Sequence, residues 1–130
     1  MMNGLTALIV DDSAVMRRAI KEELQAIGEC SVVGEGANGL EALEMARALH
    51  PDLIVMDLHM PVMGGIEALR LLKMELPQIE VVMVSSILEQ EHRHYALGLG
   101  AYACLEKGAD LWERLPAIVT ELAVKCPAKT

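Results

Sequence analysis

Four short apolar runs in this chain each lead to a residue that could bind a metal or a phosphoryl group. Residues 8–10 precede Asp11 and Asp12, residues 53–56 precede Asp57, and residues 81–84 precede Ser85. The fourth run, residues 104–105, lies shortly before Lys107. In an open parallel α/β sheet, the carboxyl ends of the strands lie along one edge, where ligands bind. We therefore expect these side chains to converge on one compact site for a divalent metal and a phosphoryl group.

Segments with the period of a helix separate the apolar runs, and this alternation is typical of β-α units on a parallel sheet. We expect strands at 5–10, 31–35, 53–56, 81–84 and 103–105, and helices at 14–27, 39–49, 65–75, 89–99 and 110–123. The strand at 53–56 is apolar throughout, which indicates a central strand buried on both faces.

Several residues define the expected helix ends and faces. Ser13 is the predicted N-cap of the first helix. The predicted apolar faces are Val15, Ala19 and Leu24 in the first helix, Leu40, Leu43 and Ala46 in the second, and Ile66, Leu69 and Leu72 in the third. The helix at 39–49 is expected to stop before Pro51. Pro116 is expected to kink the last helix or to mark its true start.

Length and composition favour one domain over residues 1–130 with an aliphatic core. The chain has 130 residues, of which 53% are hydrophobic, but no Phe. A net charge of -8 disfavours direct binding to nucleic acid or to an anionic membrane surface. Cations and basic protein surfaces are more natural partners.

Cysteine usage and the N-terminus indicate a cytoplasmic protein. Cys30, Cys104 and Cys126 are an odd number without a CxxC pair, which favours free thiols in a reducing compartment. The first residues lack the pattern of a signal peptide, and no apolar run approaches the roughly 20 residues that span a bilayer.

The strand-end motifs resemble those of the receiver domain of two-component response regulators. The motifs are Val-Asp-Asp-Ser at 10–13, Asp57 followed by Met-Pro at 60–61 and Gly65, Val-Met-Val-Ser-Ser at 82–86, and Gly-Ala at 100–101 ahead of Lys107. The resemblance covers nearly the whole chain. It implies a flavodoxin-like fold, with five parallel strands in the order 2-1-3-4-5 and helices on both faces.

The resemblance also implies that Asp57 accepts a phosphoryl group from a histidine kinase. A carboxylate is a weak nucleophile toward phosphorus, but Mg²⁺ held by nearby carboxylates would neutralise the transferring group. Asp12 is the first expected direct ligand. By resemblance, Asp57 is both ligand and nucleophile, Asp11 holds the metal through water, and the backbone carbonyl of His59 completes the set.

Two further roles follow from the resemblance. Lys107 would place its charge against the phosphoryl oxygens, and the Ser85 hydroxyl would bind one of them once the acyl phosphate forms. Drawing Ser85 inward would repack the surface of the fourth helix. Such a chain is a switch, and its only catalysis would be its own phosphotransfer and dephosphorylation.

Each of these residues also has a simple structural interpretation. The acids could be turn or strand-end residues, Lys107 a surface amine and Ser85 a loop residue, but chance would then have placed all of them at consecutive strand ends. The His59 side chain could modulate water attack on the acyl phosphate or be an exposed bystander. His92 and His94 favour a solvated helix face over a metal cluster, because residues that are two positions apart in a helix point to different sides.

Three rival functions explain less of the sequence. Residues 34–39 match GxGxxG after a strand, as in dinucleotide-binding proteins, but that interpretation leaves Asp11, Asp12, Ser85 and Lys107 without a role. A phosphohydrolase would need a second acid where His59 stands. An adaptor that works without phosphorylation is the third rival, and the intact acidic pair argues against it.

Three departures from the family pattern concern the switch. The aromatic residue usual three positions before the lysine is Cys104, and Tyr102 lies two positions earlier, where strand alternation predicts the same face. Cys104 and Tyr102 are therefore candidate modulators. The usual proline after the lysine is Gly108, which predicts no cis bond there, and the usual Asp-Gly before the third helix is Gly64-Gly65.

The resemblance implies a histidine kinase or a histidine phosphotransfer protein as the upstream partner. No output domain is expected within these residues, so the output is binding to a downstream protein, a relay of the phosphoryl group, or a domain missing from this chain. The expected docking face is the fourth helix with the fifth strand and helix, and a homodimer through it stays open. Two of the motifs are most similar to receivers of chemotaxis methylesterases, which favours chemotaxis.

Overall fold

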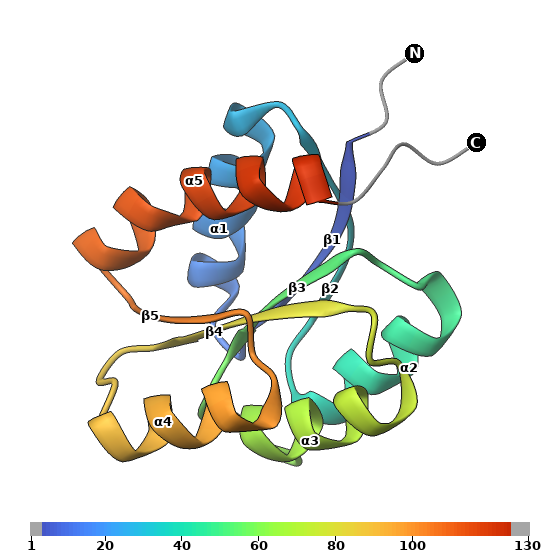
Figure 1. Cartoon of the computed structure of the whole chain (residues 1–130), viewed down its shortest axis with the longest axis vertical. Helices are drawn as coiled ribbons and strands as arrows, with labels where there is room; N and C mark the ends of the chain where they lie inside the picture. Colours follow the sequence, from blue (N-terminus) through green and yellow to red (C-terminus); the bar gives the residue numbers. More distant parts are fainter. Residues whose placement is uncertain (1–3, 126–130) are drawn as a thin grey trace.

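A five-stranded parallel sheet carries helices on both faces (Figure 1). The structure is a computed structural model of the chain, and residues 4–125 are described. The strands are β1 (Leu5–Val10), β2 (Cys30–Gly36), β3 (Leu53–Asp57), β4 (Glu80–Ser85) and β5 (Ala103–Glu106). The helices are α1 (Ala14–Ile27), α2 (Gly39–Leu49), α3 (Gly65–Glu75), α4 (Gln90–Leu99) and α5 (Ala109–Lys125).

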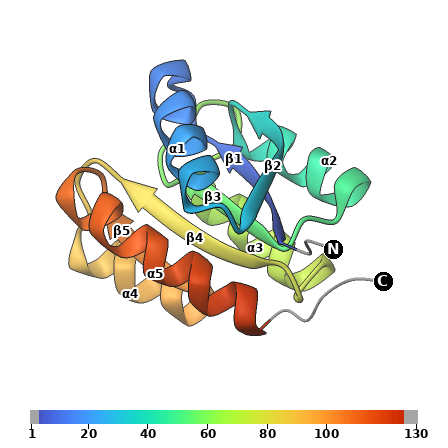
Figure 2. The ribbon, with the colours of Figure 1, turned by 90° about the horizontal axis from the view of Figure 1, so that it is seen from above.

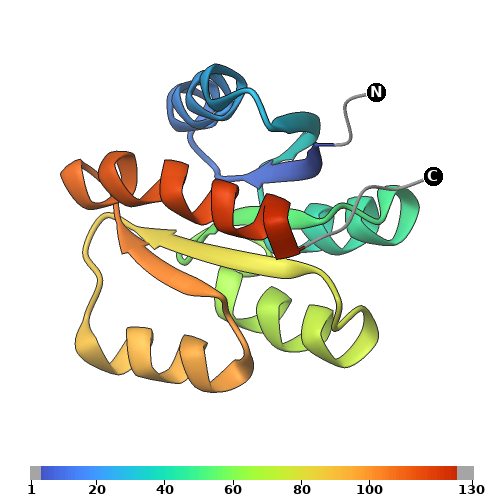
Figure 3. The same ribbon diagram turned by 45° about the horizontal axis from the view of Figure 1, so that its top comes forward.

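The strand order β2-β1-β3-β4-β5 confirms the predicted flavodoxin-like topology. All five residues of β3 are buried, as expected for the central strand. Figure 3 shows α5 on one side of the sheet and α3 and α4 on the other. In Figure 2, α4 and α5 lie beside β5, while α2 lies beside β2 at the other end.

The core is divided by the sheet into two apolar clusters. One joins β-strand residues to α1 and α5 through Ile20, Leu24 and Leu115. The other joins the opposite strand face to α2, α3 and α4 through residues such as Leu43 and Leu69. Alternating side chains of the strands supply both clusters, so the apolar runs are buried on both faces.

Ser13 caps α1 as predicted, because its hydroxyl accepts a hydrogen bond from the Met16 N–H at 3.2 Å. The predicted apolar face of α1 is wrong at Val15, which is 81% exposed. Leu24 is buried as predicted, but the buried stripe runs on through Ile20 and not through Val15, because Ile20 lies on the side of the helix that faces the sheet.

Two other helix details differ from the sequence prediction. Leu40 is 41% exposed, and Ala42 is buried beside Leu43 in its place. Pro116 lies inside α5, which is continuous from Ala109, so it does not mark the start of the helix. None of the helices among residues 4–125 is long and apolar enough to cross a membrane.

The loop from β3 to α3 contains a strained turn at Val62. The Met63 N–H donates to the Pro61 carbonyl at 2.7 Å, and Val62 between them has a φ of 68°. A β-branched residue in this region is sterically disfavoured, whereas glycine adopts it freely.

We therefore expect Val62→Gly to stabilise the fold by about 1 kcal/mol, because release of backbone strain exceeds the entropic cost of glycine. Urea denaturation would measure the change. Val15→Gly is the control, because Val15 is equally exposed but lies in a regular helix, where glycine should destabilise. If Val62→Gly and Val15→Gly both lower the stability, the backbone at Val62 is not strained.

Candidate functional site

Three carboxylates meet at the carboxyl ends of β1 and β3. Asp11 follows β1, Asp12 begins the turn into α1, and Asp57 is the last residue of β3. One oxygen from each carboxylate lies within 4.8 Å of the others. Asp11 and Asp57 are buried and Asp12 is exposed, so the group opens to solvent on one side.

Lys107 supplies the positive charge of this site. Its Nζ lies 2.9 Å from Asp11 Oδ2 and 3.4 Å from Asp57 Oδ2. The backbone N–H of Lys107 donates to the Ser85 carbonyl at 2.8 Å, which continues the pairing of β5 with β4. Burial alone would lower the pKa of the Lys107 ammonium, but the pairing with Asp11 and Asp57 outweighs it and raises this pKa. Lys107 is therefore a fixed cation beside the acids.

The surroundings of Asp57 disfavour the ionised form of its carboxyl group. Burial and the charge of Asp11 raise the pKa of Asp57, although Lys107 and the His59 N–H oppose the shift. The buried Asp11 Oδ2 pairs with Lys107 but receives no well-aligned hydrogen bond from residues 4–125. An additional cation would stabilise the ionised Asp57 and would also interact with the Asp11 oxygen. The donors are all carboxylates, which are ligands that Mg²⁺ prefers.

Ser85 lies at the end of β4 with its side chain fully buried. Its hydroxyl donates to the Ile87 carbonyl at 2.9 Å, so it is engaged with its own loop. Ser85, Asp57 and Lys107 line one open cavity of about 590 Å³. The other lining residues are Asp12, Ser13, His59, Ser86, Ile87, Glu89 and His92.

The cavity also receives two histidines. His59 follows β3 and is exposed, and its ring meets the ring of His92 edge-on, with centroids 5.7 Å apart and planes at 71°. The sequence did not single out His92 as part of the site, because only the packing of α4 brings it there. His94 lies on the exposed side with Tyr95, in a separate depression.

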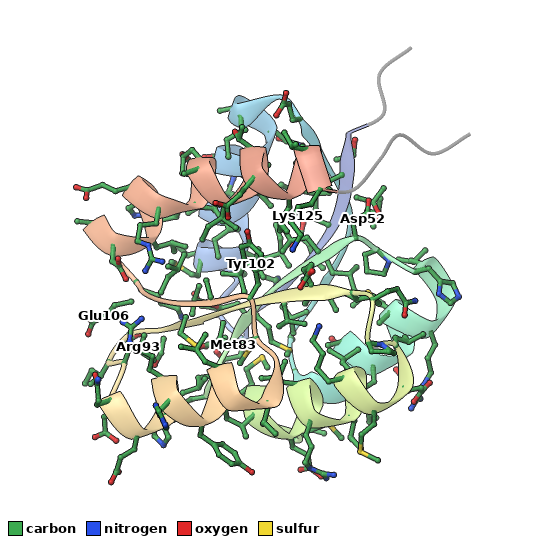
Figure 4. The ribbon with its side chains drawn as sticks, viewed as in Figure 1. Asp52, Met83, Arg93, Tyr102, Glu106 and Lys125 are labelled. Carbon is green, nitrogen blue, oxygen red and sulfur yellow. The ribbon has the colours of Figure 1, made fainter. Side chains whose placement is uncertain are left out.

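The two candidate modulators lie on opposite sides of the sheet. Cys104 is buried in the cluster under α4, and burial raises the pKa of its thiol. Tyr102 packs against the α1 and α5 cluster, its hydroxyl donates to Glu121, and Lys125 Nζ lies 5.4 Å from its ring centre (Figure 4). The expectation that Tyr102 shares the face of Cys104 is wrong. Strand alternation does not extend to it, because β5 begins only at Ala103.

The glycines at 34–39 serve packing. A Cβ at Gly39 would lie 2.8 Å from the Met63 carbonyl oxygen, and one at Gly36 would lie 2.7 Å from Met45 Cε. The N-terminus of α2 is already occupied by an acid of the chain, since the Glu41 carboxylate accepts the Ala37 N–H at 2.7 Å. This arrangement does not favour the dinucleotide-binding alternative.

Comparison with known proteins is consistent with this geometry. A family model described as "Response regulator receiver domain" matches residues 7–119. The curated response regulator protein VraR of Staphylococcus aureus is 44% identical over 96 residues, which are 74% of this chain and 46% of VraR. The chain thus spans about half the length of the curated relatives it matches.

Solved structures agree over almost the whole chain. The response regulator domain of Thermotoga maritima CheB is 34% identical with a TM-score of 0.82, covering 95% of this chain and 98% of that one. The receiver domain of the putative response regulator NarL from Mycobacterium tuberculosis is 26% identical with a TM-score of 0.86, covering 95% and 99%.

Proposed function

Because the chain belongs to the response regulator receiver domain family, we propose that Asp57 is its phosphoryl acceptor and that phosphorylation changes the surface of α4. One observation carries this proposal: Asp57 lies beside the Lys107 ammonium, 3.4 Å away, and within 4.8 Å of two further carboxylates in an open cavity. This is the arrangement that an in-line transfer to a carboxylate needs. Receiver domains are signalling modules, not classical enzymes.

The proposed donor is a phosphohistidine of a histidine kinase or of a histidine phosphotransfer protein. A carboxylate oxygen of Asp57 attacks phosphorus and forms a P–O bond, while the P–N bond to the imidazole breaks. The electron pair stays on the imidazole nitrogen, which takes up a proton from solvent. The products are an acyl phosphate at Asp57 and a neutral histidine, so the transfer is balanced without any further reactant.

Receiver domains bind Mg²⁺ at an acidic cluster, and here the candidate ligands are Asp11, Asp12, Asp57 and the backbone carbonyl of His59. We propose that Asp12 and Asp57 bind directly and that Asp11 binds through water. Mg²⁺ would neutralise charge on the transferring group. The exposed Asp12 leaves the cluster open to a cation from solvent, while the Lys107 ammonium lies beside Asp57.

After transfer, Lys107 and Ser85 would exchange their present partners. The Lys107 ammonium would bind a phosphoryl oxygen in place of an Asp11 oxygen. The Ser85 hydroxyl would leave the Ile87 carbonyl and donate to the phosphoryl group. Residues 86–89 lead directly into α4, so this exchange would alter the surface that α4 presents to a downstream partner.

The downstream side of the switch is also a proposal. The altered face of α4, β5 and α5 would bind a target protein, a second copy of the chain, or a further domain such as the relatives' greater length allows. A role in chemotaxis is one such output.

Asp12→Asn is expected to lower the affinity for Mg²⁺ by about tenfold or more, because it replaces an anionic ligand by a neutral amide. Isothermal titration calorimetry with MgCl₂ would measure this. Glu113→Gln, which removes an exposed carboxylate of α5, is the matched control and should bind as the native chain does. Equal affinities in all three proteins would refute the assignment of Asp12.

The function is tested by intact-mass spectrometry after incubation with phosphoramidate. With Mg²⁺, we expect one added phosphoryl group that is lost in base, as an acyl phosphate is. With chelator, we expect none. A chain that binds Mg²⁺ but gains no phosphoryl group from phosphoramidate or from a histidine kinase would instead favour an adaptor that works without phosphorylation.

A further inference from the structure

Apolar packing attaches α4 to the rest of the protein only weakly. Of its ten residues, Ala96 alone is buried. The helix is also the most polar of the five by sequence, with charged or polar residues along most of its first two turns. Polar and ring contacts must therefore contribute a large share of what holds α4 in place.

Two adjacent side chains of α4 make these contacts in different directions. His92 points to the cavity and meets the ring of His59, on the loop after β3, at 5.7 Å between centroids. Arg93 points to the edge of the sheet and donates from its guanidinium to the Cys104 carbonyl at 2.9 Å. One turn of α4 is thus attached to both the loop after β3 and β5.

Two further hydrogen bonds join this region to β5, one at the Arg93 carbonyl and one at Leu88, just before α4. The Cys104 thiol donates back to the Arg93 carbonyl at 3.9 Å. The Leu88 N–H donates to the Glu106 carboxylate at 3.4 Å. Figure 4 shows Arg93 and Glu106 together where α4 meets β5. A small thiol stands at position 104, so the guanidinium rather than an aromatic ring connects this strand to the helix.

These contacts restrain residues 86–89 and α4, the segment that the proposed switch moves. The Ser85 hydroxyl donates to the Ile87 carbonyl, and the proposed exchange of this bond for a phosphoryl oxygen displaces residues 86–89. β3 and β5 are hydrogen-bonded into the sheet, whereas α4 follows the displaced loop. The contact of His92 with the loop after β3 and that of Arg93 with β5 therefore differ between the empty and the phosphorylated site.

We propose that His92 and Arg93 are positioning residues that tether α4 in the arrangement of the empty site and so oppose the switch. Because a contact made in only one of two states shifts the equilibrium between them, the tethers lower the affinity of the site for a phosphoryl group. This inference rests on the proposed phosphorylation of Asp57.

Beryllofluoride with Mg²⁺ is a suitable probe, because it mimics an acyl phosphate without covalent turnover. His92→Ala and Arg93→Ala are each expected to bind it about three- to tenfold more tightly than the native chain in calorimetric titration, the scale of one aromatic or hydrogen-bonded contact. The unliganded variants should also melt at a lower temperature. His94→Ala is the matched control, two residues along on the exposed side, and should bind beryllofluoride as the native chain does and melt at no lower temperature.

A tether is indicated if the variant binds beryllofluoride more tightly although it melts at a lower temperature. Loss of a merely structural contact would lower both the affinity and the melting temperature. Amide hydrogen exchange gives a second readout, in which residues 86–93 of unliganded Arg93→Ala should exchange faster than in the native chain. Should Arg93→Ala fail to fold, Arg93→Lys shortens the donor while keeping the charge. Unchanged or weaker binding by the variants refutes the tethers alone, whereas a native chain that binds no beryllofluoride refutes the proposed function.

Discussion

Asparagine in place of Asp57 is expected to abolish phosphoryl uptake and, without Mg²⁺, to stabilise the chain at neutral pH. Uptake is lost because an amide oxygen is not a nucleophile toward phosphorus under these conditions. Stability rises because burial and the charge of Asp11 disfavour the ionised Asp57 carboxylate. Intact mass with phosphoramidate and urea denaturation with chelator measure the two effects.

The stability effect has a defined dependence on pH. Because the folded pKa of Asp57 is raised above the ordinary 3.8, the native state binds this proton more tightly than the unfolded state does. The native chain therefore loses stability as the pH rises from about 3.8 through the folded pKa, and the loss is complete above it. The advantage of Asp57→Asn should be largest at neutral pH and disappear in acid. An advantage that grows in acid would contradict the assignment.

Gly65→Ala is expected to destabilise the fold by about 3 kcal/mol or more. A Cβ at Gly65 would lie 2.2 Å from the Asp57 carbonyl oxygen and 3.0 Å from Leu58 Cα. Both are backbone atoms, which cannot move aside without displacing the end of β3 and the Asp57 side chain with it. Urea denaturation should show the loss of stability, and phosphoryl uptake from phosphoramidate should slow as well.

Gly98→Ala is the matched control for Gly65→Ala. A Cβ at Gly98 would meet no atom within 4 Å, and the residue lies in the exposed part of α4. Alanine there should stabilise by about 0.5 to 1 kcal/mol, because it favours the helix. A Gly65→Ala variant as stable as the native chain would show that the start of α3 is not fixed by the backbone of β3.

The strands and the acidic cluster were predictable because they depend on local pattern and on one topological rule. Apolar runs defined β1, β3 and β4, and the strand ends at Asp11, Asp57 and Ser85 then shared one edge of the sheet. Helix boundaries were equally accessible where a cap was present, as at Ser13. These features require no knowledge of how the helices pack.

The remaining features depend on tertiary packing. Val15 and Ile20 are both apolar, and only the docking angle of α1 decides which is buried. Tyr102 precedes β5, so its side depends on the preceding turn and not on alternation. His92 and Arg93 belong to a helix with a polar sequence, and their contacts appear only when α4 lies against the loop after β3 and the edge of β5.

Identifying the residue that carries the phosphoryl group tests most directly the central claim that Asp57 is the acceptor. The chain would be phosphorylated with phosphoramidate and Mg²⁺, reduced with borohydride, which converts an acyl phosphate to an alcohol, digested, and sequenced by mass spectrometry. The proposed function predicts homoserine at position 57 and an unmodified aspartate at positions 11 and 12. Modification at another residue, or a phosphoryl group that resists reduction, would contradict Asp57 as the acceptor.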